Sequence, residues 1–258
     1  MKVVPAFRRY LGIMGALLRR EEESRRQAPM DTIMNLIEPV FLIGMLSFLF
    51  YFLGRRQGSP LGGSAILFYA TGFFPLYLFI YISRRMRGAI GNPRRRFPVE
   101  QRLDHILVHV IMRIIDYSVL GLFLFTGIYV VFTLDAAPYD LVKVLEACMA
   151  IVALGFGWGV FNLVLMQKWQ LWSFISAGVS RSLIVLSGVV FVPDFLSPDV
   201  REVMAYNPLL HAIQLFKLGF YPRYPAILLD RSYLFYCAVF AVFFGLILER
   251  VTRRSESR

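Results

Sequence analysis

The sequence has few of the residues that disulfides, metal sites and hydrolytic centres need. Only two cysteines occur in 258 residues, Cys148 and Cys237, and both lie in apolar segments, so we expect neither a disulfide nor a zinc site. Of the three histidines, His105 and His109 have the i, i+4 spacing of a helical metal pair, but an H-E-x-x-H motif with its third ligand and catalytic glutamate is missing. We therefore predict no metal site and no catalytic residue.

The motifs of nucleotide hydrolysis and acyl transfer are also absent. No G-x-x-x-x-G-K-[S/T] loop and no G-x-S-x-G elbow occurs, so the chain cannot hydrolyse ATP alone. The glycines at 155, 157 and 159 lie inside an apolar segment and favour close helix packing instead. Lysine is scarce among the 28 basic residues, and the net charge of +11 needs no nucleic acid, because a cytoplasmic bias of arginine and anionic lipid account for it.

What the sequence does have is long apolar runs. Hydrophobic residues make up 57% of the chain, mean hydropathy is +0.60, and residues 57–83 carry no charge. A hydrocarbon core requires about 20 such residues per helix, so we predict an all-α polytopic membrane protein, with 1–258 as a single transmembrane domain. Six transmembrane helices are predicted, over 32–53, 64–82, 105–134, 145–166, 173–192 and 232–248.

Orientation follows from the basic residues near the ends of these helices. Six crossings place both termini on one side, and nineteen basic residues lie on that side against seven on the other. Both termini are therefore predicted to be cytoplasmic. The opening MKVVPAFRRY has neither the apolar stretch nor the small-residue cleavage site of a signal peptide, so we expect no segment to be removed.

Three segments lie outside the predicted crossings. Residues 1–31 have the pattern of an amphipathic helix in the headgroup plane, with Arg8, Arg9, Arg19 and Arg20 toward lipid; a solvated lead-in helix is the alternative. Residues 84–104 form a polar, arginine-rich cytoplasmic loop.

Residues 193–230 contain two helix starts, Ser197-Pro198 and Asn207-Pro208. They predict short helices over 198–205 and 208–220, too short to cross, which form a re-entrant or surface hairpin on the outer side. This hairpin is either a gate or a static cap.

Several charged residues fall within the predicted crossings. His105, His109, Arg113 and Asp116 lie on one helical face, either as an internal Arg113–Asp116 ion pair or as a cytoplasmic vestibule for an anionic substrate. Arg181, near mid-span, is the better candidate for a contact with a translocation path. Glu38 is near the cytoplasmic end of its helix and is expected to snorkel.

Four segments in this order resemble the landmarks of polysaccharide-export ABC transporter permeases, in particular the KpsM-like capsule exporters. They are Leu36-Ile37-Glu38-Pro39-Val40, Tyr69-Ala70-Thr71-Gly72-Phe73-Phe74-Pro75, Ser187-Gly188-Val189-Val190-Phe191 and Tyr206-Asn207-Pro208-Leu209-Leu210-His211. One departure is the approach to the first crossing, residues 27–32, which lacks the tryptophan that often precedes the Glu-Pro pair in that family.

The resemblance implies a homodimer in the bacterial inner membrane that exports lipid-linked capsular polysaccharide. A separate cytoplasmic ATPase, which binds ATP and Mg, is implied for each copy, and periplasmic and outer-membrane export proteins are expected partners. The chain itself is then no enzyme, holds no cofactor and binds no nucleic acid.

The resemblance also implies roles for segments. Residues 1–31 lie beside the substrate entrance, and 84–104 dock on the ATPase through Arg84, Arg85, Arg87, Arg94, Arg95 and Arg96. Residues 193–230 form the periplasmic gate, with Tyr206, Asn207 and Pro208 and a polar edge of His211, Gln214 and Lys217 toward the emerging sugar chain.

Two other functions stay open. The first is a permease of the same class for O-antigen, teichoic acid or a hydrophobic drug. The second, more distant one is an integral-membrane enzyme, which requires clustered acid and base residues at one membrane face; only the stripe from His105 to Asp116 offers such a cluster.

Overall fold

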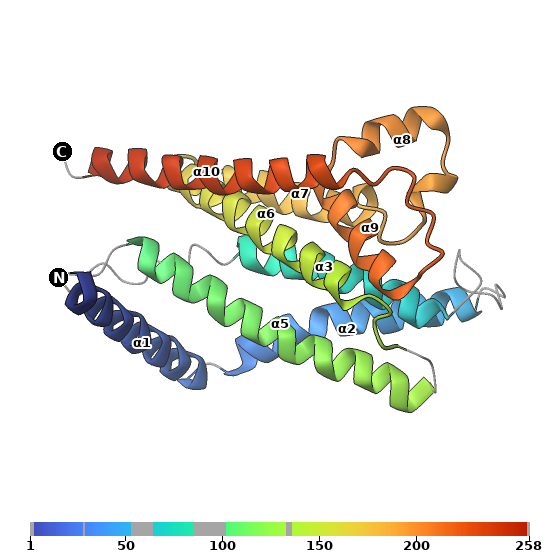
Figure 1. The fold of residues 1–258 in the computed structure, drawn as a ribbon, viewed down its shortest axis with the longest axis horizontal. Coiled ribbons are helices and arrows are strands. Elements are labelled where there is room, and N and C mark those ends of the chain that lie inside the picture. Colours follow the sequence, from blue (N-terminus) through green and yellow to red (C-terminus); the bar gives the residue numbers. More distant parts are fainter. Residues whose placement is uncertain (1–2, 28, 53–63, 85–101, 133–135, 257–258) are drawn as a thin grey trace.

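A computed structural model describes residues 3–27, 29–52, 64–84, 102–132 and 136–256, and all regular secondary structure in them is helical (Figure 1). The elements are α1 (Val3–Gln27), α2 (Pro29–Phe52), α3 (Ala65–Arg84), α5 (Arg102–Phe132), α6 (Leu141–Lys168), α7 (Trp172–Leu186), the 3-10 turn η2 (Pro193–Phe195), α8 (Pro198–Ala205), α9 (Pro208–Phe220) and α10 (Arg231–Glu256). For these residues the all-α prediction is confirmed.

Four of the described helices are long and apolar enough to cross a membrane. They contain the segments Ala65–Arg84, Leu103–Phe132, Leu141–Lys168 and Arg231–Val251. The shorter apolar segments Leu36–Leu49 and Trp172–Leu186 belong to α2 and α7. The chain is therefore a polytopic membrane protein, and the described part of each predicted crossing lies mostly on an apolar helix.

Helix α3 is the centre of the bundle. Every side chain from Leu67 to Ser83 is buried, which agrees with a sequence that is apolar on all sides. The helix packs against α2, α5, α6 and α9. At its middle, Phe74 lies within aromatic contact distance of Tyr117 and Phe125 on α5 and Phe216 on α9, so one ring joins three helices.

Glycines allow α6 and α10 to approach closely. A methyl group at Gly157 would overlap the backbone carbonyl of Ala241 on α10, and one at Gly245 would lie 3.2 Å from the Cα of Gly157. Gly155 packs in the same way on Ile82 of α3. For Gly155 and Gly157 the predicted role in close helix packing is confirmed.

Helix α7 ends earlier than predicted, at Leu186 instead of residue 192. Gly188 has a φ of +65°, a left-handed conformation that favours glycine, and a methyl group there would overlap the Pro193 ring. The chain therefore leaves the helix at residues 187–188 and turns into η2. The short helices α8 and α9, in contrast, begin and end at the predicted residues.

The two ends of the bundle differ. The start of α1 and the end of α10 lie at one end, whereas α8 and α9 lie at the other (Figure 1). This arrangement agrees with termini on one side of the membrane and a hairpin on the opposite side. Below, the end that holds α8 and α9 is called the outer end.

Candidate functional site

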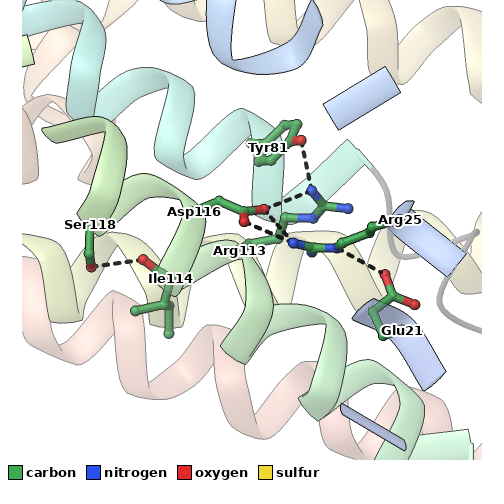
Figure 2. A network of polar contacts seen from close by, with 7 residues as sticks. All are labelled: Glu21, Arg25, Tyr81, Arg113, Ile114, Asp116 and Ser118. Carbon is green, nitrogen blue, oxygen red and sulfur yellow. Dashed lines mark hydrogen bonds and ion pairs between the residues drawn. The ribbon is translucent and has the colours of Figure 1, made fainter. Parts of the chain in front are cut away.

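One polar cluster joins α1, α3 and α5, and we call it the α1 clamp: Arg25, Tyr81, Arg113 and Asp116 (Figure 2). Arg25 Nη1 on α1 donates to both oxygens of Asp116 on α5, at 2.8 and 2.9 Å. Arg113 Nη1 donates to Asp116 Oδ2 at 3.1 Å and to Tyr81 Oη on α3 at 2.7 Å. One carboxylate thus holds two guanidinium groups from different helices.

Burial makes this pairing necessary. The side chains of Arg113, Asp116 and Arg25 are only 4%, 13% and 14% exposed. Charges that leave water are costly unless they are paired and hydrogen-bonded, so removing Asp116 would take the shared carboxylate away from two guanidinium groups. Glu21 adds a second carboxylate 3.6 Å from Arg25 Nε. The clamp therefore fixes the end of α1 along α5.

The structure contains the predicted ion pair between Arg113 and Asp116. It also adds Arg25, which lies 91 positions away from Asp116 in the sequence and which sequence reasoning missed. On the same helix, His109 is buried and His105 is half-buried. In the described part of the chain, no three His, Cys, Asp or Glu side chains gather as metal ligands.

At the outer end, polar side chains follow one face of α9. Asn207 Oδ1 accepts from the amide of Leu209 and so caps this helix, at 3.0 Å. Its Nδ2 donates to the carbonyl of Leu186 and to Ser187 Oγ, at 3.0 and 3.2 Å. The same side chain therefore stabilises the start of α9 and the end of α7.

The next two polar residues on this face bind neighbouring backbone and side-chain groups. His211 Nδ1 accepts from the amide of Asp230, so Nε2 carries the proton and donates to the carbonyl of Ala205 at 2.7 Å. Gln214 Nε2 donates to Asp194 Oδ2 at 3.1 Å, and Asp194 Oδ1 accepts from the amide of Leu228. These bonds connect α9 with η2 and with the segment before α10.

Lys217 is completely buried without a carboxylate partner among the described residues. Its Nζ donates to the carbonyl of Gly188 at 2.9 Å and lies 3.4 Å from that of Val189. It also lies 3.9 Å from the ring centroid of Phe68 on α3, a cation–π distance. Burial lowers the pKa of Lys217 to about 7.

The polar edge of α9 faces the interior of the bundle in this conformation, and its predicted contact with the sugar chain stays a prediction. His211, Gln214 and Lys217 are 2%, 1% and 0% exposed, because α9 is buried on every side. Of the other residues predicted for the gate, Tyr206 is exposed, and Asn207 and Pro208 are half-buried. The backbone carbonyl of Tyr206 accepts from Tyr233 Oη at 2.8 Å.

The two other charges predicted within the membrane lie at the surface of the chain. Arg181 is exposed on α7, and its proposed contact with a translocation path stays a prediction. Glu38 is exposed on α2 and accepts a hydrogen bond from Tyr77 Oη on α3 at 3.1 Å. This bond ties α2 to the central helix, a contact that the sequence did not reveal.

The arginines predicted to bind the ATPase fall mainly on residues 85–101, outside the described residues. Arg84, the last residue of α3, is exposed. On α1, Arg19 is exposed and Arg20 is half-buried, whereas the side chains of Arg8 and Arg9 lie outside the described ones.

An apolar groove of about 610 Å³ runs between α6, α7 and α10. Its aromatic lining includes Trp158, Phe161, Tyr236, Phe240 and Phe244. These rings offer few hydrogen-bonding groups, and a hydrated sugar chain needs many. The groove therefore suits hydrocarbon better than a polysaccharide.

The sequence is similar to known proteins of the inner membrane. The ABC-2 type transporter family matches residues 14–221. The chain is 24% identical over 222 residues to the capsule polysaccharide export inner-membrane protein BexB of Haemophilus influenzae, a match that covers 83% of each chain. It is 22% identical over 239 residues to the capsule polysaccharide export inner-membrane protein CtrC of Neisseria meningitidis serogroup B, which covers 92% of this chain and 89% of that protein.

The membrane-length helices agree with the inner-membrane location in both names, and the sequence lacks an ATPase motif of its own. The family match reaches from α1 to the end of α9 and covers well over half of the chain. This inner-membrane protein therefore belongs to the ABC-2 type transporter family of permeases.

Proposed function

We propose that this chain is the permease subunit of an exporter that moves lipid-linked capsular polysaccharide across the bacterial inner membrane. The observation that carries the proposal is the alignment with two capsule polysaccharide export proteins over 83% and 92% of the chain. The energy comes from a separate ATPase, because the permease has no nucleotide-binding loop.

The working unit is a homodimer with an ATPase bound to each copy. Each chain crosses the membrane six times, through α2, α3, α5, α6, α7 and α10. Segment 84–104 docks on the ATPase, and Arg181 on α7 faces the translocation path or the dimer centre. The charge of Arg181 supports this placement, because burying an unpaired guanidinium in hydrocarbon costs at least about 2.5 kcal/mol of free energy.

The α1 clamp gives the interfacial helix a fixed position. Leu17 of α1 is buried, and Arg25 is held by Asp116 on α5, so α1 lies against the bundle instead of extending into solvent. Its exposed charged face includes Arg19 and Arg26, which suit anionic headgroups. In this position α1 can receive a lipid-linked substrate at the membrane surface.

Gene deletion in the native host tests the proposed cargo. We expect loss of surface capsule and accumulation of lipid-linked capsular polysaccharide inside the cell, both reversed by the wild-type gene on a plasmid. Loss of O-antigen or teichoic acid with an intact capsule would instead assign another glycan. Intact surface glycans with sensitivity to a hydrophobic drug would assign drug export.

A further inference from the structure

The two helices of the outer hairpin differ in how firmly they are held. In α9, every residue from Leu209 to Lys217 is buried, and the helix packs against α3, α6 and α10. Near its end, the carbonyl of Gly219 accepts from the amide of Asp140 at 2.9 Å, and a methyl group at Gly219 would overlap Val144 on α6. Helix α9 is therefore part of the core of the bundle.

The polar side chains of α9 hold it further. Asn207 binds the end of α7, Gln214 binds Asp194 of η2, and Lys217 binds the carbonyl of Gly188. If α9 moved away from these groups, the buried amide of Gln214 and the buried amine of Lys217 would lose their acceptors, and each loss is costly in an apolar environment. These bonds therefore resist displacement of α9.

Helix α8 has the opposite character. Met204 is its only buried residue, while Val200 and Val203 are exposed. It packs chiefly on η2 and α9 and projects from the outer end of the bundle (Figure 1). Few buried contacts and a surface position are typical of segments that open at low free energy.

Both ends of α8 have features of a hinge. Ser197 at its start makes no side-chain capping bond, so the first turn lacks that restraint. At its end, the Ala205 carbonyl accepts from His211 Nε2 on α9 and the Tyr206 carbonyl accepts from the solvent-exposed Tyr233 hydroxyl, so residues 205 and 206 are the pivot on this side. Beyond the hinges the chain is fixed again, by Asp194 on one side and by Asn207 on the other.

We propose that the outer hairpin consists of a fixed frame, residues 207–220, and a movable flap, residues 197–206, and that opening of the outer exit is a motion of the flap alone. This inference deepens the proposed export function, because the flap is the gate of that same path. The wider gate segment 193–230 is thus reduced to one short helix that swings between Ser197 and Tyr206.

Hydrogen exchange on the purified resting protein tests the division into a fixed frame and a movable flap, and it requires no transport. We expect the amides of the flap to exchange about tenfold faster, or more, than those of residues 209–217. Tyr233→Phe, which removes one hydroxyl at the hinge, should accelerate exchange in the flap and leave the frame unchanged. Equal exchange in the two segments would overturn the division, whatever the protein exports.

Cysteine labelling during ATP turnover tests the gate itself. In a Cys148→Ser, Cys237→Ser background that retains export, Val203→Cys reports on the flap, Phe216→Cys on the frame, and Tyr139→Cys is a control of similar exposure (68% for Val203, 76% for Tyr139). With an impermeant maleimide, labelling of residue 203 should change severalfold with ATP and ATPase, residue 139 should react constantly, and residue 216 should stay unlabelled.

Two results would overturn the proposal in this second experiment. One is labelling of residue 216 during turnover, which would mean that α9 itself moves. The other is constant labelling of residue 203 while export of the glycan continues, which would mean that the exit opens elsewhere. A wrong assignment of the cargo gives a different result. In that case the Cys148→Ser, Cys237→Ser variant hydrolyses ATP with its ATPase but exports no lipid-linked capsular polysaccharide.

Discussion

Two buried basic side chains among the described residues are held by different chemistry. Arg113 donates hydrogen bonds to the Asp116 carboxylate and to the Tyr81 hydroxyl, which suits a planar guanidinium with several donors. Lys217 uses two backbone carbonyls and the Phe68 ring, which suits a compact amine. Arg113 connects α5 to α3, and Lys217 connects α9 to the turn at Gly188. Removing either side chain should therefore loosen that contact.

Asp116→Asn should destabilise the protein strongly. The substitution leaves Arg113 buried without its carboxylate and leaves Arg25 with only the more distant Glu21, and breaking such a buried pair costs about 3 kcal/mol or more. Thermal melts in detergent, together with protease cleavage of α1, measure the effect. Asp140→Asn is the control, because Asp140 and Lys143 form a partly exposed pair that Asn can still cap. Similar melts for the two variants would contradict the role of the α1 clamp.

The stability of the protein should rise with pH above neutrality. Burial lowers the pKa of Lys217 from its ordinary value of 10.5 to about 7, so between these values the unfolded chain holds a proton that the folded chain has released. Unfolding takes up this proton, and the free energy of unfolding therefore increases with pH in that window. Lys217→Met should remove this part of the slope in melts from pH 7.5 to 9.5. An unchanged slope in the variant would refute the assignment.

At the scale of elements, the sequence predicted local features well. A capping residue followed by proline marks the starts of α8 and α9, and both boundaries are correct. The sequence did not predict that α7 ends at Leu186, because the apolar stretch continues past Gly188. The helix stops where Gly188 adopts a left-handed backbone conformation. The full burial of the polar face of α9 was also missed, since the sequence predicted a re-entrant or surface hairpin with a polar edge toward the sugar chain.

The packing of α6 on α10 should depend on glycine at one position. Gly157→Ala introduces a methyl group that overlaps the Ala241 carbonyl, and forcing these helices apart should cost about 1–3 kcal/mol. Gly127→Ala on α5 is the matched control, because nothing lies within 4 Å of its added methyl group, and it should be neutral or slightly stabilising. Melting temperatures of the two variants decide, and an equal effect would show that the close contact is unimportant.

At the scale of the molecule, the order of helices was predictable and their long-range contacts were not. Runs of apolar residues identify the helices, and basic residues orient them. Two of the landmark segments meet in space: a methyl group at Gly72 would lie 2.9 Å from the Val189 carbonyl. A third, through Asn207, binds Ser187. Periodicity carries no information on which distant residues meet, so these contacts and Arg25–Asp116 needed the structure.

The coupling of the permease to its ATPase should depend on residues 84–104. Replacing Arg94, Arg95 and Arg96 with Glu should leave membrane insertion intact but release or uncouple the ATPase, because acidic grooves on a partner would then face like charge. Co-purification and stimulated ATP hydrolysis are the measurements. Normal values for both would place the contact elsewhere on the cytoplasmic surface.

Transport in reconstituted vesicles tests the central claim most directly. The permease and its ATPase are placed in proteoliposomes with the ATPase outside, lipid-linked capsular polysaccharide is added outside, and protection of the glycan from an external glycosidase is followed. We predict that protection requires ATP, the ATPase and this chain together. ATP hydrolysis without any gain in protection would contradict the account, because the chain would then couple to an ATPase and still not move this polysaccharide.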